Sequence, residues 1–340
     1  MLTGSSRQWS LCSGGDPTQS VITVFRRIFS VTLLAAFIAW VLWYVSSNTE
    51  AFRPVLQVTW LDALVLTLAF LAIMIGNGLF IAVVSHAFRI RLAGFEWLSL
   101  SFASSFANYF LPFRGGTGIR ALYMNRVHGF PITKFVTTLS IMYLMHTVVN
   151  GLLALAGMGL IARNGGPLNV PLMLFFALVT VAGIAAMLIR FEVRREFEKF
   201  PLAQIAKLIN AWQAVRADRA LVTKLWVLMF AMALATVWQC RAAFDALSIA
   251  LPWEGVLVYA ASKNLATLIG LTPGAMGVVE LISIYLGTVL GYSTADALSV
   301  QALIRAVAIV SLLLLGPPAL LYLRRRIAVR APAQAGTADV

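Results

Sequence analysis

Long apolar segments alternate with short polar ones along most of the chain. The longest of these segments can each cross a lipid bilayer as a helix. They occupy residues 29–45, 63–84, 134–161, 171–189, 225–247 and 303–323. The pattern predicts an all-α polytopic membrane protein, with about six to eight transmembrane helices in a single membrane domain at residues 25–326.

Two shorter apolar segments end in proline and glycine. Residues 95–111 lead into the sequence LPFRGGTGIR, and residues 253–271 lead into TPGAMGVVE. The predicted breaks lie at Pro112, Gly115, Gly116, Gly118, Pro273, Gly274 and Gly277. Neither residue type continues a helix without cost, and irregular backbone at membrane depth persists only where it is buried in protein or lines a polar cavity. Two broken helices in corresponding halves of a chain indicate a transporter's binding site.

The two breaks predict an internal repeat. Pro112 and Pro273 are separated by 273 − 112 = 161 residues, and Gly129 and Gly291 by 291 − 129 = 162 residues. Repeat-like halves are expected at about residues 95–162 and 253–323, related as an inverted repeat. The charges of the loops leave two topologies open: six crossings with two re-entrant hairpins, or eight crossings.

The remaining segments are polar or amphipathic. We expect residues 1–24 and 327–340 to be disordered tails, the first of them cytoplasmic. Residues 194–219 carry apolar side chains at helical spacing with Lys and Arg between them. Two interpretations stay open for this segment: an amphipathic helix on the cytoplasmic face of the membrane, or a solvated connector packed on the protein.

Composition and charge agree with a membrane protein. Hydrophobic residues make up 60% of the chain, and 26 Lys and Arg against 13 Asp and Glu give a net charge of +13. The basic residues are spread among the loops, as the positive-inside rule requires, so we expect no nucleic-acid partner. Their distribution predicts a multi-pass protein of the cell membrane with both termini in the cytoplasm. The two cysteines, Cys12 and Cys240, have no disulfide or metal spacing.

Several charged side chains fall in or beside apolar segments. They are Arg114, Arg120, Lys263, Glu280 and Arg305. A charge at the centre of a transmembrane helix costs about 2.5–3.5 kcal/mol on insertion scales, so such residues usually face a cavity or a partner.

Two interpretations of these charges are compatible with each other. In the first, Arg120 and Glu280 follow the two breaks in equivalent places and form an ion pair. In the second, Arg114, Arg120 and Lys263 form a basic pocket for a phosphate headgroup, because the guanidinium fork suits phosphate and a helix start favours an anion. Asn108 and Asn264 are the neutral residues expected at this site, and Glu280 and Arg305 are expected around it as well.

The segments around the two breaks resemble a known family. The sequence from Asn108 to Arg120, the motif from Pro273 to Glu280 and the later Arg305 are similar to the flippase-like transmembrane domain of lysylphosphatidylglycerol synthases. The resemblance covers about residues 25–326 and implies a protein that moves a lipid between leaflets. The family's Gly-Glu pair before the arginine that matches Arg120 is absent here. The aminoacyl-transferring domain of the full synthases is also absent, so lysine transfer is not expected.

The sequence therefore predicts a lipid transporter or flippase-like protein for an anionic, polyprenyl-phosphate or hopanoid-type lipid. The alternative is a membrane-embedded glycosyltransferase, or an accessory subunit of a lipid-modifying enzyme, in which Glu50 and Asp62 could act as acids. We expect no cofactor and no metal site. The expected partners are a membrane lipid and a lipid-modifying enzyme, and the sequence leaves the oligomeric state open.

Overall fold

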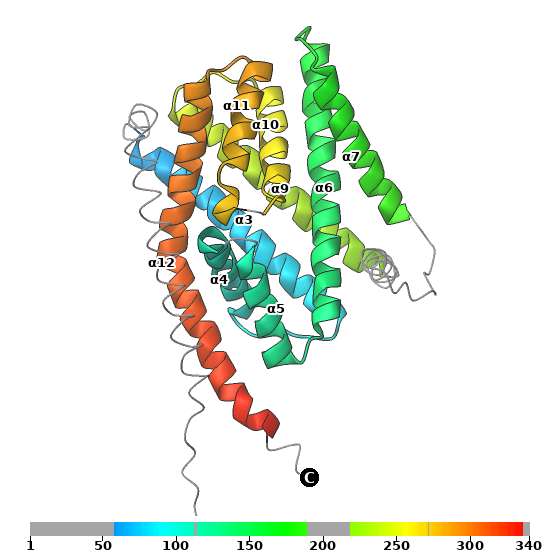
Figure 1. Ribbon diagram of the computed structural model, residues 1–340, viewed down its shortest axis with the longest axis vertical. Coiled ribbons are helices and arrows are strands. Elements are labelled where there is room, and N and C mark those ends of the chain that lie inside the picture. Colours follow the sequence, from blue (N-terminus) through cyan, green and yellow to red (C-terminus); the bar gives the residue numbers. More distant parts are fainter. Residues whose placement is uncertain (1–57, 112–113, 189–217, 271, 336–340) are drawn as a thin grey trace, which may run out of the picture. The chain divides into compact units, whose positions relative to one another are not determined.

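The computed structural model describes residues 58–111, 114–188, 218–270 and 272–335, with side chains described up to residue 328. Every regular element in these ranges is a helix, which confirms the all-α fold (Figure 1). Six helices within them are long and apolar enough to cross a membrane, so the protein is a multi-pass membrane protein. The expected span at residues 29–45, the tail at residues 1–24 and most of residues 194–219 lie outside the described ranges.

The helices follow one order twice. Each set has a long helix, a short helix, a break, a second short helix, a glycine turn and another long helix. The first set is α3 (Trp60–Ala87), α4 (Glu96–Phe110), α5 (Gly115–His128) and α6 (Ile132–Arg163). The second is α9 (Arg219–Ala246), α10 (Trp253–Ala266), the 3-10 turn η2 (Pro273–Ala275), α11 (Val278–Leu290) and α12 (Thr294–Ala335). Helix α7 (Val170–Leu188) comes between the two sets in the sequence.

The two sets are spaced along the chain by similar offsets. The helix starts are offset by 219 − 60 = 159, 253 − 96 = 157, 278 − 115 = 163 and 294 − 132 = 162 residues. The long helices α3 and α9 share this spacing, and both lie outside the predicted halves at residues 95–162 and 253–323. That the chain contains a repeat, and that its halves are related by inversion, stays a prediction.

The two sets pack across each other. Helix α3 packs along α9, α4 packs against α12, and α10 packs against α6, as Figure 1 shows. The α3–α9 contact is close, because a Cβ at Gly76 would overlap with the side chain of Met232. Each set's first short helix thus lies on the final long helix of the other set, and residues of both breaks line a common cavity.

Local interactions and backbone conformation explain where several helices begin and end. Thr59 caps α3 by accepting a hydrogen bond from the Asp62 N–H. Gly129 and Gly291 end α5 and α11 with φ of 62° and 84°, a conformation that glycine adopts without steric cost.

The C-terminal tail that the sequence placed at residues 327–340 is helical as far as Ala335, because α12 continues through it. Alanine and arginine are good helix formers, and extending an existing helix costs no new nucleation.

A buried carboxylate joins three helices near the start of α4. Glu96 is fully buried and accepts hydrogen bonds from Tyr123 Oη at 2.7 Å and from the Ala93 N–H at 2.9 Å. His128 Nε2 lies 2.6 Å from its Oε1, and Arg326 Nη1 of α12 lies 3.8 Å from its Oε2. Burial raises the pKa of Glu96, but the hydrogen bonds from His128, Tyr123 and Ala93 outweigh it and lower the pKa to about 2.

We predict that Glu96 makes the stability of the protein depend on acidity. Its pKa is lower in the folded state than its ordinary value of 4.5, so its contribution is complete above pH 4.5 and is lost as the pH falls toward 2. The full contribution is about 3 kcal/mol. The unfolding midpoint of Glu96→Gln in detergent should therefore fall less than that of wild type between pH 5 and pH 3. Asp245→Asn, at a carboxylate whose side chain is half exposed, is the control. Parallel curves for wild type and Glu96→Gln would contradict the prediction.

We predict that replacement by alanine changes the unfolding free energy in opposite directions at two nearby glycines of α5. A Cβ at Gly116 would overlap with the carbonyl oxygen of Ser104, whereas a Cβ at Gly118 meets nothing within 4 Å. Gly116→Ala should lower the unfolding free energy by about 2 kcal/mol or more, since the overlapping atom belongs to the backbone. Gly118→Ala should be neutral or stabilising by up to about 1 kcal/mol, since alanine favours the helix. Thermal unfolding of the two purified variants in one detergent measures both, and equal shifts would contradict the α4–α5 contact.

Candidate functional site

The first break separates α4 from α5. Helix α4 gives way to extended backbone at Leu111, and α5 starts after Arg114, which has a left-handed φ of 52°. Gly115, Gly116 and Gly118, which the sequence placed in the break, lie within α5 instead. Gly116 serves close packing, since the α4 backbone leaves no room for a side chain there. Pro112 lies outside the described residues.

The second break is an irregular turn between α10 and α11. Thr272 is extended, Pro273 begins the 3-10 turn, and Gly274 and Gly277 have φ of 59° and 83°. Thr272 Oγ1 donates a hydrogen bond to the Met276 carbonyl oxygen at 2.7 Å and closes the turn. The positive φ values explain why glycine occupies both positions.

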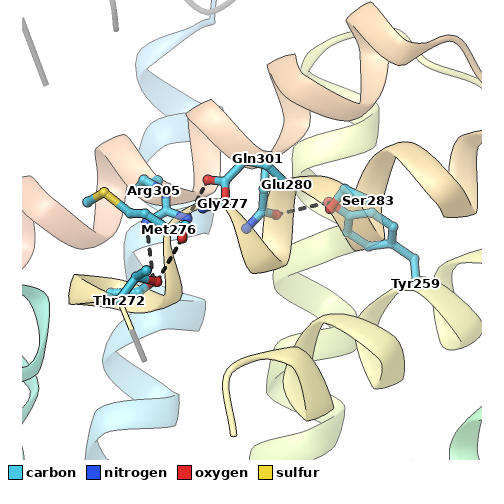
Figure 2. A network of polar contacts seen from close by, with 9 residues as sticks. Tyr259, Thr272, Met276, Gly277, Glu280, Ser283, Gln301 and Arg305 are labelled. Carbon is cyan, nitrogen blue, oxygen red and sulfur yellow. Dashed lines mark hydrogen bonds and ion pairs between the residues drawn. The ribbon is translucent and has the colours of Figure 1, made fainter. Parts of the chain in front are cut away.

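Arg305 and Glu280 hold the second break together. Glu280, in the first turn of α11, accepts from the Gly277 N–H at 2.7 Å through Oε2 and pairs with Arg305 Nη2 through Oε1 (Figure 2). Arg305 Nη1 donates to the Gly274 carbonyl oxygen at 3.2 Å. The predicted Arg120–Glu280 ion pair is therefore wrong. The carboxylate faces α12, which packs directly on α11, and its partner is the arginine on that helix.

Beside this pair, a neutral polar cluster joins three helices. Tyr259 Oη of α10 donates to Gln301 Oε1 of α12 at 2.9 Å and lies 3.2 Å from Ser283 Oγ of α11 (Figure 2). The ring of Tyr259 packs edge-on against Phe244 and Tyr292. The cluster thus fixes α10, α11 and α12 beside the second break.

Residues from both sets line a cavity of about 330 Å³. The predicted site residues that line it are Asn108, Arg114, Arg120, Lys263, Asn264 and Arg305. Glu280 is not part of the lining, although it bonds to Arg305, which is. Apolar side chains such as Phe70, Leu139 and Ile304 complete the wall. The structure therefore gathers the predicted cationic and amide side chains around one space.

Among the residues that the structure describes, the cations of the lining have only neutral partners, apart from Arg305. Arg120 is 7% exposed and donates from Nη2 to Ser104 Oγ at 2.6 Å. Lys263 is 8% exposed, and its Nζ lies 3.3 Å from Gln239 Oε1.

The side chain of the third cation, Arg114, extends from the first break toward the segment that precedes the second. It donates to the Thr267 carbonyl oxygen after α10, and its guanidinium lies 4.7 Å from the centroid of the Tyr143 ring.

The carboxylates in the described part of the chain are engaged elsewhere. Their partners are Thr59 for Asp62, His128 for Glu96, Leu221 N for Asp218, Arg241 for Asp245, Asn164 for Glu254, Arg305 for Glu280 and Ser293 N for Asp296. Arg114, Arg120 and Lys263 thus form a basic cluster without a carboxylate partner in those ranges. Because uncompensated charge is costly in a protein interior, an anion in the cavity would be stabilised.

The sequence did not identify all of the polar lining. Asn77 of α3 and Gln239 of α9 also face the cavity. Each is a polar residue inside an apolar span, and that position in the sequence could have identified both residues. His146 lines the cavity as well, while its neighbour Asn150 accepts a hydrogen bond from Asn264 Nδ2 at 2.9 Å and thereby joins α6 to α10. Within the described ranges, His, Cys, Asp and Glu form no group able to hold a metal ion.

Comparison with known proteins gives one match. The family model described as the lysylphosphatidylglycerol synthase TM region matches residues 80–316, a range that includes both breaks and the whole basic cluster. This confirms the resemblance that the sequence motifs predicted. Among curated proteins and among solved structures, nothing matches the chain.

We predict that Glu280 and Arg305 are energetically coupled. Glu280→Ala should lower the unfolding free energy by about 3 kcal/mol, because it leaves a largely buried arginine without its carboxylate. Adding Arg305→Met should recover part of this loss. A double-mutant cycle in detergent measures the coupling.

The same cycle with Arg120→Met in place of Arg305→Met is the control. Its coupling energy should be near zero, because Arg120 and Glu280 are not paired. Equal coupling in the two cycles would contradict the assignment.

Proposed function

The chain belongs to the lysylphosphatidylglycerol synthase transmembrane-region family, and from this membership we propose that it is a flippase-like protein that moves an anionic lipid between membrane leaflets. One observation carries the proposal: Arg114, Arg120 and Lys263 surround a cavity between two broken helices and have no carboxylate partner in the described ranges. A phosphate group would supply the missing negative charge.

The chemistry of the lining favours phosphate. The guanidinium groups of Arg114 and Arg120 each present several donors in one plane, which suits the oxygens of a phosphate. Helix α5 begins directly after Arg114, and the N–H groups of a first helical turn favour an anion. These features support a headgroup site at the first break.

The surroundings of the cavity suit a lipid better than a soluble anion. Apolar side chains such as Met74, Leu139 and Leu312 share the wall with the cations. A headgroup could occupy the polar part while its acyl or polyprenyl chains stay against apolar surface. An anionic phospholipid and a polyprenyl phosphate both meet this requirement, and so does a hopanoid that carries an acidic group.

The repeated helix order suggests how the site could open to either side. Transporters built from inverted repeats place the substrate between broken helices and alternate the access to it by moving one repeat against the other. We propose that the α3–α6 and α9–α12 sets form such a repeat, with re-entrant hairpins at the breaks. The loop charges further support insertion in the cell membrane with both termini in the cytoplasm.

The glycosyltransferase alternative receives no support from Asp62. Its Oδ2 accepts a hydrogen bond from Thr59 Oγ1 at 2.6 Å, as part of the cap of α3. Asp62 therefore has a structural use that explains its position, and Glu50 lies outside the described residues.

We predict that Arg120→Gln strongly slows lipid movement in a protein that still folds. Liposomes with acyl-labelled fluorescent phosphatidylglycerol would be treated with a membrane-impermeant quencher, and the rate of inner-leaflet quenching measured. The variant should be slower by about tenfold or more, since it loses the charge that contacts phosphate. Arg120→Lys should keep an intermediate rate.

The matched control is Arg241→Gln, which removes an arginine that pairs with Asp245 four residues away and does not line the cavity. It should move lipid at the wild-type rate. All proteins should elute from gel filtration as wild type does. An unchanged rate in Arg120→Gln would refute the proposed site.

A further inference from the structure

One histidine lies among the cations of the cavity. His146, on α6, is part of the lining, and its buried Nε2 atom has no hydrogen-bond partner in the part of the chain that the structure describes. The ring also makes a hydrogen bond with the backbone of Asn264, on α10. Because buried polar atoms are normally paired, the unpaired nitrogen beside a cavity indicates a group that is bound there in some state of the protein.

The backbone of Asn264 determines which ring nitrogen carries the hydrogen. Asn264 lies in the last turn of α10, where carbonyl oxygens have no partner within the helix, and its carbonyl oxygen also accepts from Thr267 Oγ1 at 2.6 Å. The nitrogen of His146 that bonds to this carbonyl must therefore be the donor. A neutral imidazole has one donor and one acceptor nitrogen, so Nε2 keeps a lone pair that can accept a proton.

His146 differs from the other titratable residues of the lining in the pH range over which it ordinarily titrates. The others that the structure describes are Tyr109 of α4, Arg114 before α5, Arg120 of α5, Tyr143 of α6, Lys263 of α10 and Arg305 of α12. Glu280 of α11 is not part of the lining and is paired with Arg305. Lysine and arginine are ordinarily charged at neutral pH and tyrosine is neutral, whereas imidazole ordinarily gains or loses its proton between about pH 5 and pH 8.

The cations make protonation of His146 depend on what the cavity binds. Arg114 acts electrostatically on the ring, and Arg120 and Lys263 line the same space without a carboxylate partner in the described ranges. Like charges disfavour the imidazolium form. An anion in the cavity adds the opposite charge, so it favours protonation of Nε2, and the N–H formed there can donate to the anion.

We propose that His146 binds a proton together with the anionic lipid, so that the loaded cavity carries one proton more than the unloaded one. The proton comes from water on the side where the lipid enters, and Nε2 releases it to water on the side where the lipid leaves. A proton gradient therefore drives the lipid toward the alkaline side. This inference rests on the proposed function, because it names the ion that is coupled to lipid movement at the same site.

A pH gradient across liposomes tests the coupling. Phosphatidylcholine vesicles would contain the protein and a trace of acyl-labelled phosphatidylglycerol, and the impermeant quencher would report the label in each leaflet. With wild type, the label should become enriched in the leaflet on the alkaline side, approaching about tenfold for a gradient of one pH unit. Protein-free vesicles give the background. Lipid movement without enrichment, or with enrichment on the acidic side, would overturn the inference and leave the proposed function standing.

Histidine variants assign the coupling to one residue. His146→Asn keeps an amide nitrogen that can donate to Asn264 but cannot take up a proton, so the label should move without becoming enriched under the gradient. The control is His86→Asn, which replaces an exposed histidine at the end of α3 that does not line the cavity. This control should enrich the label as wild type does. Equal enrichment in His146→Asn and wild type would refute the role of His146.

Proton uptake on binding separates this inference from transport. Detergent-purified protein would be titrated with short-chain phosphatidylglycerol at about pH 8, where imidazole is ordinarily neutral. Calorimetry in two buffers with different ionisation enthalpies gives the affinity and the number of protons taken up. Wild type should take up protons, approaching about one for each bound lipid, and His146→Asn should take up none.

The outcomes of this titration distinguish the two proposals. Uptake by wild type that moves no lipid in liposomes would support the coupling and count against the flippase function alone. Binding of lipid without proton uptake would overturn the coupling alone. Absence of binding would overturn both.

Discussion

The arrangement of the membrane domain depends on how it accommodates positive charge among apolar helices. Arg305 is paired with a carboxylate, and the pair also bonds to the backbone of the second break. Arg120 is 7% exposed, and within the described residues its hydrogen-bond partner is the hydroxyl of Ser104. One cation thus stabilises the second break, and the other has no carboxylate partner in the described ranges. The broken helices make this possible, because their irregular backbone leaves room for polar groups at membrane depth.

The two sets of helices share one plan but differ in chemistry. In the second set, the carboxylate of Glu280 caps α11 and neutralises an arginine. In the first set, the corresponding turn of α5 has glycine and threonine, so Arg120 has no acidic neighbour on its own helix. The absence of the family's Gly-Glu pair in this stretch therefore has a physical consequence: the cavity keeps more positive charge than a fully paired network would.

Proline, glycine and charge in apolar segments were enough to predict the helical membrane fold and the positions of both breaks, because those residues act through local backbone chemistry. The same reasoning failed for the partner of Glu280, since the choice between Arg120 and Arg305 depends on which helix packs on α11. It did not include α3 and α9 in the predicted halves, because neither helix has a break to mark it. Glu96 was also overlooked, because its partners Tyr123, His128 and Arg326 come from distant parts of the sequence.

The contact at Gly116 has a mechanical consequence. The backbones of α4 and α5 touch there so closely that not even a methyl group fits between them, and helices in such contact can only shift together. At the second break, the space beside Gly277 is open within 4 Å. A displacement of α5 would therefore carry the C-terminal part of α4 with it, a backbone coupling that the second break lacks at Gly277.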